Sequence, residues 1–122
     1  MPLTIVVPKD PFTSTSPAEI YLTASGGAAI KAFFISDTAA NPPTIALEVD
    51  NPEEPQAGPC KLGPGTHHCR LSVSAVDLGK GAGGSYKVSL TVNGTEAAYA
   101  KGNTEKPLAV EGDNRNFTLI VE

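Results

Sequence analysis

Apolar and polar residues alternate along much of this chain, which is the pattern of β-strands that bury one face. The clearest example is the segment 86–92, in which every second residue is apolar. The same alternation recurs at residues 3–7, 20–24, 45–49, 69–75 and 117–121. The segment 30–35 is apolar almost throughout, which predicts a central strand buried on both faces.

The region after residue 92 admits two interpretations. Asn93-Gly94 is the favoured dipeptide of a two-residue hairpin, because both turn positions need a positive φ. A hairpin there would place Ala97 and Tyr99 on the buried side. Residues 95–101 also carry the end signals of a short helix. We favour the hairpin, because a helix this short is not stable alone.

These segments predict about eight short strands separated by turns rich in the chain's 12 glycines and 11 prolines. Neither a strand–helix alternation nor an internal repeat is visible, and 122 residues suit one core. We therefore expect an all-β fold, namely an antiparallel immunoglobulin-like β-sandwich of about seven or eight strands, forming a single domain over residues 1–122.

Four stretches resemble strands of known domains. PKDPFTSTSP at 8–17, IYLTASG at 20–26 and IKAFFI at 30–35 are similar to the opening of bacterial immunoglobulin-like domains. GSYKVSLTV at 84–92 is similar to a late strand of those domains and of PKD-type domains. The resemblance covers the first 36 residues and the region 69–92, and it implies a non-enzymatic spacer or adhesive role in an extracellular protein.

The charge of the chain and the length of its apolar runs argue against two classes of partner. Nine basic residues are scattered without a run, and the net charge is −4. Nucleic-acid binding draws on clustered Lys and Arg, so we expect no nucleic-acid partner. We also expect no membrane insertion, because no apolar run approaches the roughly 20 residues that a spanning helix needs. Residues 1–10 show no recognisable secretory leader.

Cys60 and Cys69 are the only cysteines, and the Gly-Pro-Gly between them can reverse the chain. We expect a disulfide, which would contribute about 2.7 kcal/mol on the chain-entropy estimate. It would make the protein extracellular, periplasmic or surface-exposed. Two alternatives stay open: two reduced, buried thiols, or a zinc site that adds His67 and His68. Adjacent residues of an extended segment point to opposite faces, so we expect no metal and no cofactor.

The segment 51–69 is the longest connection that the pattern leaves, and it is our candidate for a partner-binding loop. Its charged and titratable side chains would make the contacts, namely Glu53, Glu54, Lys61, His67 and His68. The alternative is that this loop only covers a sheet edge. Asp50 with Glu53 and Glu54 could also bind calcium, but a solvated acidic loop is the simpler interpretation.

Candidate chemistry is otherwise sparse. G-x-G-x-x-G at 79–84 matches a nucleotide-binding motif, but a strand follows it where that motif needs a helix, so we expect an inter-strand loop. No G-x-S-x-G nucleophile elbow occurs, and we expect no catalytic residues. The chain has no Trp, and Tyr21 is the one aromatic residue that we expect to be exposed for a ligand such as a sugar.

The primary prediction is a non-catalytic interaction, adhesion or spacer module that contacts another protein or a surface polymer through loops or a strand edge. The alternative is a carbohydrate- or small-ligand-binding domain appended to a secreted enzyme. A small hydrolase that uses His67 or His68 ranks last.

Overall fold

The computed structural model describes residues 2–122, so Met1 of the predicted domain lies outside the described residues. Residues 2–122 contain nine strands and no helix, hence no helix that could span a membrane. In chain order the strands are β1 (Phe12–Ser14), β2 (Ala18–Ser25), β3 (Ala29–Asp37), β4 (Thr44–Asn51), β5 (Gln56–Leu62), β6 (Gly65–Val76), β7 (Ser85–Val92), β8 (Thr95–Asn103) and β9 (Val110–Val121). The predicted all-β class is confirmed, with one or two strands more than expected.

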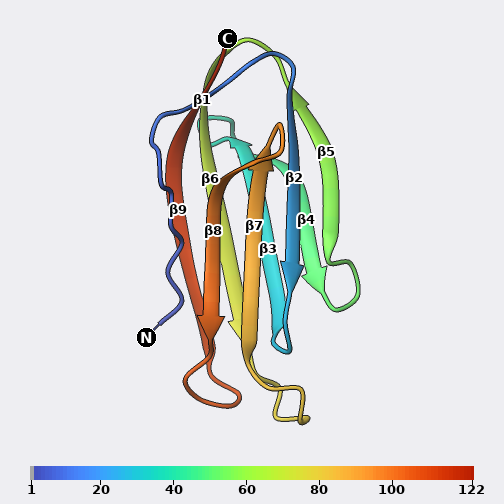
Figure 1. The fold of residues 1–122 in the computed structure, drawn as a ribbon. Helices are drawn as coiled ribbons and strands as arrows, with labels where there is room; N and C mark the ends of the chain where they lie inside the picture. The colour runs from blue at the N-terminus through green and yellow to red at the C-terminus, as the bar shows by residue number, and fades with distance from the viewer. Residues whose placement is uncertain (1) are drawn as a thin grey trace.

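The strands form two sheets that pack face to face (Figure 1). The four-stranded sheet has the order β5-β2-β7-β8, and the five-stranded sheet has the order β1-β9-β6-β3-β4. Neighbouring strands are antiparallel, except that β1 runs parallel to β9. Only β3–β4 and β7–β8 are consecutive strands paired within one sheet, so the chain crosses repeatedly from one layer to the other.

The core between the sheets is built from the inward-facing residues of each alternating strand. Ile20 and Leu22 of β2 are 0% exposed, whereas Tyr21 between them is 43% exposed. Other large side chains enclosed in the same way are Ile5, Ile30, Phe34, Val49, Leu71, Val88, Leu90, Val92 and Leu119. Burying each such side chain contributes about 1.5–3 kcal/mol, which is why the alternation predicts the layers well.

Strand β3 is central in its sheet, as predicted, but only one of its faces is buried. Ile30, Ala32 and Phe34 point into the core and are at most 1% exposed. On the outer face Lys31 is exposed and Phe33 is half-buried. The prediction of burial on both faces is wrong, because no described element forms a third layer over this sheet.

The hairpin interpretation is confirmed, and the helix interpretation of residues 95–101 is wrong. Asn93 and Gly94 form the turn with φ of 48° and 82°. A regular two-residue hairpin would pair Leu90 with Ala97, but Ala97 is an extra residue in β8, and Leu90 pairs with Ala98 instead. This bulge reverses the alternation, and Tyr99, predicted to be buried, faces outward and is half-buried.

The predicted loop over 51–69 is also wrong, because it contains all of β5 and the first residues of β6. Strand β5 escapes the alternation pattern because Pro55, Gly58 and Pro59 interrupt it. Proline is tolerated there, since β5 is an edge strand that pairs only with β2. The short strand β1, which pairs with β9, escapes the pattern as well.

The predicted first strand, residues 3–7, is extended but belongs to neither sheet. Leu3 and Ile5 are buried in the core, and the backbone of Val6 makes an isolated bridge with Tyr99 of β8. Two carboxylates of β9 accept hydrogen bonds from the other backbone amides: Glu111 from Leu3 N at 3.0 Å and Asp113 from Ile5 N at 2.9 Å. The segment therefore lies between β8 and β9, where it contributes apolar side chains to the core.

Candidate functional site

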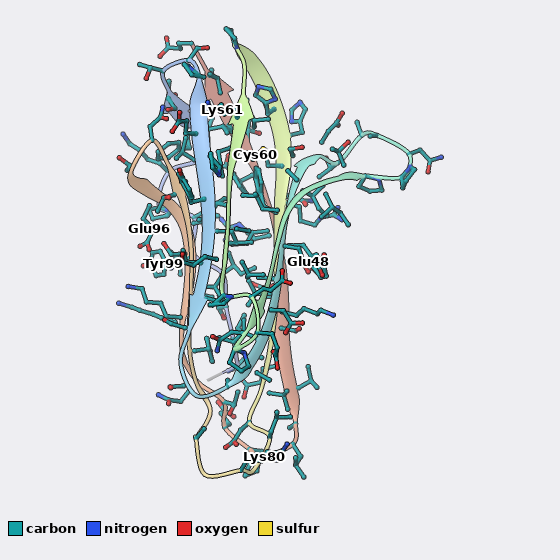
Figure 2. All side chains as sticks on the ribbon, turned by 90° about the vertical axis from the view of Figure 1, so that its right-hand side faces the viewer. Glu48, Cys60, Lys61, Lys80, Glu96 and Tyr99 are labelled. Carbon is teal, nitrogen blue, oxygen red and sulfur yellow. The ribbon has the colours of Figure 1, made fainter. Side chains whose placement is uncertain are left out.

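The five residues predicted to form one partner-binding loop do not lie together. Glu53 and Glu54 sit in the turn before β5, whereas Lys61, His67 and His68 lie at its far end or beyond it. Strand β5 has seven residues, so at about 3.3 Å per residue it separates the two groups by roughly 20 Å. Figure 2 shows Lys61 near one end of the molecule, with Lys80 at the opposite end.

Cys60 and Cys69 are free thiols, so the structure does not support the predicted disulfide. The prediction assumed a tight reversal between them. Instead, Gly63 and Pro64 carry the chain from β5 in one sheet to β6 in the other. The structure matches the alternative of two reduced thiols, and the argument for an oxidising compartment loses its basis.

The two thiols differ in environment. Cys69 is 1% exposed, and its Sγ lies 3.8 Å from the carbonyl oxygen of Ser36 and 3.6 Å from that of His67. Burial raises the pKa of Cys69 to about 12, with smaller contributions from the charges of Cys60 and Asp37. Burial also raises the pKa of Cys60, which is half-buried. Neither thiol has the lowered pKa of a reactive nucleophile.

The histidines do not assemble a metal site with the cysteines. The Nε2 of His67 lies 2.9 Å from the carbonyl oxygen of Gly63, while His68 is exposed next to Thr118 of β9. Across residues 2–122 no three His, Cys, Asp or Glu side chains are placed to hold a metal ion. The ligand sets considered for zinc and for calcium are therefore not assembled.

Four connections meet at the end of the sandwich away from the C-terminus, which is the lower end in Figure 1. We call it the loop end, and it consists of residues 26–28, 52–55, 77–84 and 104–109. The G-x-G-x-x-G motif lies here, and strand β7 follows it directly, so its prediction as an inter-strand loop is confirmed. Glu53 and Glu54 are the only residues of the predicted loop site that belong to this end.

Hydrogen bonds hold the first connection, residues 26–28, in place. Asn51 is 7% exposed, and its Nδ2 donates to the carbonyl oxygens of Gly26 and Ala28, each at 3.1 Å. The amide of Ala28 donates in turn to the carbonyl oxygen of Ser85 at 2.9 Å. The turn between β2 and β3 is therefore fixed both to β4 and to β7.

The two longer connections are tied to each other. The amide of Leu108 donates to the carbonyl oxygen of Asp77 at 2.7 Å, and the amide of Thr104 donates to that of Gly84 at 2.9 Å. Asp77 also accepts a bond from the amide of Gly79 at 2.8 Å through its side chain. Residues 77–84 and 104–109 thus form one cross-linked surface.

Three large apolar side chains stand exposed on this surface. Leu78 is 48% exposed, and Leu108 and Val110 are each 71% exposed. They are neighbours, since Leu108 bonds to the residue before Leu78, and Val110 pairs with Val76 of β6. We call Leu78, Leu108 and Val110 the apolar cluster.

Leu108 is held in the left-handed backbone region with a φ of 63°. A residue with a Cβ pays roughly 1–2 kcal/mol there, so such a conformation persists only where surrounding bonds impose it. The bond from its amide to Asp77 is one such constraint. The Leu108 side chain remains largely in solvent, so its burial does not offset the backbone strain.

Shallow hollows continue from the apolar cluster across the adjoining surface. One, of about 160 Å³, is lined by Gly27, Ala29, Pro52, Asp77, Leu78, Lys80, Ala82 and Gly83. A second, of about 260 Å³, lies over the five-stranded sheet and is lined by Ala29, Ile30, Lys31, Asp50, Ser74, Ala75, Val76 and Val110. The two hollows share one lining residue, Ala29.

The apolar cluster was not predicted from the sequence. Leu78 and Leu108 lie in connections between strands, where alternation carries no information. A signal was available, since Leu78 is a single apolar residue between Asp77 and Gly79, and Leu108 opens the short apolar run 108–110 directly after Lys106-Pro107. Tyr21, by contrast, is exposed on the four-stranded sheet as predicted.

These observations define an all-β protein of two packed sheets with an apolar surface at one end. No protein-family model matches the chain, and no curated protein matches it. Among solved structures, a DUF4425 family protein from Bacteroides ovatus ATCC 8483 is similar to this chain, with a TM-score of 0.47 and 15% identity over 86% of this chain and 96% of that one. A structural similarity this low supports no conclusion about family or function. Membership of the bacterial immunoglobulin-like or PKD-type domains therefore remains a prediction.

Proposed function

We propose that this protein is a non-catalytic interaction module that binds another protein through its loop end. The observation that carries the proposal is the apolar cluster, in which Leu108 and Val110 are each 71% exposed. Exposed apolar side chains that gather at one place mark interaction surfaces, whereas single scattered ones do not. Burying one such side chain in an interface contributes about 1.5–3 kcal/mol.

The hydrogen-bonded loops support the proposal energetically. Binding is weakened by the entropy lost when mobile loops become ordered, and loops that are ordered beforehand avoid that loss. The bonds from Leu108 to Asp77 and from Thr104 to Gly84 join the two connections that carry the cluster. The strained backbone of Leu108 is consistent with selection for a contact and not for stability.

The charges around the cluster favour a protein over a polyanion. Lys80 and Lys106 lie in the same connections as Asp77 and Glu105, so both signs are present. Nucleic acid and anionic lipid would favour a basic surface, and the whole chain carries a net charge of −4. A mixed polar rim around an apolar centre is the usual anatomy of a protein–protein interface.

The strand order supports an immunoglobulin-like form of the sandwich. In that fold the chain passes several times between the two sheets, as it does here, and β1 pairs in parallel with the last strand, β9. Strands β2, β3, β5, β6 and β9 then occupy the positions of strands B, C, E, F and G. The hairpin β7–β8 would be an insertion before the last strand that supplies two of the four strands of its sheet.

An adhesion or spacer role outside the cytoplasm remains part of the proposal. It rests on the resemblance to extracellular domains, because the free thiols remove the support that a disulfide would have supplied. Loops at one end of a sandwich are where many such domains carry their contacts, because a rigid scaffold positions them there.

Site-specific photo-crosslinking in the native source tests the proposal. A photoreactive residue replaces Leu108 in one variant and the exposed Thr95, beside the turn at the opposite end, in another. We expect a discrete crosslinked protein from position 108 only, and we expect Val110→Asp to reduce its yield at least fivefold. Equal products from both positions, or a yield that Val110→Asp leaves unchanged, would contradict the proposal.

A further inference from the structure

A second surface of the molecule carries a different kind of contact, on the outer face of the four-stranded sheet. Tyr21 of β2 is 43% exposed there. The bulge at Ala97 turns Tyr99 of β8 onto the same face, where it is half-buried. Figure 2 shows Tyr99 and Glu96 on one side of the sandwich, with Glu48 on the other. The face therefore presents two aromatic rings.

The spacing of the two rings follows from the strand register. Tyr21 pairs with Thr91, whereas Tyr99 pairs with Ser89, which pairs with Thr23 on β2. The tyrosines are thus two strands apart and offset by two residues. With about 4.8 Å between strands and about 3.4 Å per residue, their Cα atoms lie roughly 12 Å apart across the sheet.

Hydroxyl groups occupy the sheet between the rings. Thr23, Ser89 and Thr91 are half-buried and lie on the outward side of their strands. The Oγ of Ser89 donates to a carboxylate oxygen of Glu96 at 2.5 Å. A ligand lying across this face would meet an aromatic ring at each end and hydrogen-bonding groups in the middle.

The edge strand β5 leaves room for the Tyr21 ring by carrying a glycine where the two come close. At Gly58 of β5 a Cβ atom would lie 2.9 Å from Cδ1 of Tyr21 and 2.7 Å from the carbonyl oxygen of Ile20. Glycine is therefore required at this position, where φ is 124°. The Tyr21 ring consequently lies against the backbone of β5 and is restrained before any ligand arrives.

Charges on this face are of both signs, with Glu19 and Glu96 beside Lys61, Lys87 and Lys101. Glu19 lies 3.8 Å from Lys61 in an ion pair, and the Nζ of Lys101 lies 5.8 Å from the centre of the Tyr99 ring. A polyanion would gain little from such a face, and a protein partner would find two separate rings in place of one apolar patch. A neutral ligand with apolar and hydroxyl-bearing surfaces matches it better.

We infer that this face binds a neutral, extended saccharide chain. The apolar C–H face of a sugar ring packs on an aromatic ring, which offers an apolar body with a polar tip. Sugar hydroxyls would bond to Thr23, Ser89 and Thr91 between the tyrosines. An open sheet face that bears two separated rings accommodates an oligosaccharide, whereas a monosaccharide would reach only one of them. This inference goes beyond the proposed function, since it concerns another face and another class of ligand.

Affinity electrophoresis in native gels containing a neutral polysaccharide tests the inference. The probes are a mixed-linkage β-glucan, a xylan and a galactomannan, with polygalacturonate as the anionic comparison. We expect at least one neutral polymer to retard the wild-type chain. Tyr21→Ala and Tyr99→Ala should each weaken that binding at least tenfold, and Tyr21→Phe should retain most of it because the ring remains.

Two control variants separate this site from the rest of the molecule. Phe33→Ala removes a half-buried ring from the outer face of the other sheet, and Leu108→Asp alters the apolar cluster. Both should bind as the wild type does, with circular dichroism confirming that each variant is folded. Lack of retardation in every neutral polymer, retardation by polygalacturonate alone, or retardation that neither tyrosine variant affects would overturn the inference.

Discussion

The thiol of Cys69 is enclosed by the core, and burial keeps its pKa at about 12. Cys60 is half-buried, and its pKa is raised by burial as well. Since only a thiolate reacts with alkylating agents, iodoacetamide at pH 8 should modify Cys60 slowly and Cys69 only after unfolding. Intact mass would show one adduct in native protein and two in denaturant. An unreduced sample that accepts no adduct in denaturant would contradict the assignment of free thiols.

The same burial makes stability depend on alkaline pH. The folded pKa of Cys69, about 12, lies above the ordinary thiol value of 9.0. The stability linked to the protonated thiol is therefore fully present below pH 9 and is lost as the pH rises through 12. Between pH 8 and 10.5 the free energy of unfolding should fall by about 2 kcal/mol more in the wild type than in Cys69→Ala. Urea titrations at the two pH values measure this difference, and equal losses would contradict it.

Leu108 offers a test of strain that is separate from binding. Leu108→Gly removes an exposed side chain and relieves a φ of 63°. Relief of roughly 1–2 kcal/mol exceeds the entropic penalty of glycine, so the variant should be more stable by up to about 1 kcal/mol. Leu78→Gly, at a position without a positive φ, should be less stable by about 0.5–1 kcal/mol. Thermal unfolding would measure both, and two changes of the same sign would contradict the role of strain.

The exposure of individual side chains was the feature of the candidate site that the sequence predicted least well. The exposure of Tyr21 was predicted correctly, because alternation along the strand puts its side chain on the face opposite to Ile20 and Leu22. The apolar cluster was missed because exposure in a connection follows from which loops bond to each other, and Leu108 bonds to a residue 31 positions away. Tyr99 was assigned to the wrong face for a related reason, since one extra residue changes the parity of every residue after it.

At the scale of elements, alternation predicted most strands with a buried face and failed at the edge strands β1 and β5. Strand β5 pairs on one side only, so it tolerates the Pro59 and Gly58 that conceal it in the sequence. The bulge in β8 could not be predicted from the sequence, because Ala97 and Ala98 are both small apolar residues and both are buried. The predicted loop and disulfide failed together, since both assumed that no strand lies between residues 51 and 69.

Gly58 tests whether β5 is built around the Tyr21 ring. In Gly58→Ala the new Cβ meets backbone and ring at under 3 Å, while in Gly65→Ala it has nothing within 4 Å. Both positions have a positive φ, of 124° and 136°. Each variant should lose about 1–3 kcal/mol from backbone strain, and Gly58→Ala should lose about 1–3 kcal/mol more from the clash. Urea unfolding of the two variants gives the difference directly, and equal losses would show that the contact is unimportant.

At the scale of the whole molecule, two packed sheets leave two kinds of surface free for partners. The connections at the loop end are held by bonds such as that from Asn51 to Gly26, and they present the apolar cluster. The outer face of the four-stranded sheet is polar, with two separate rings. The scaffold itself uses its apolar residues to hold the layers together, including Ile5 from a segment that belongs to neither sheet.

A hydrogen-exchange map of the complex with the crosslinked partner tests most directly whether this module binds a protein through the loop end. We expect binding to slow amide exchange in residues 77–84 and 104–110 and to leave exchange in the Asn93-Gly94 turn unchanged. Slowed exchange at the opposite end of the sandwich, with residues 77–84 and 104–110 unaffected, would contradict it.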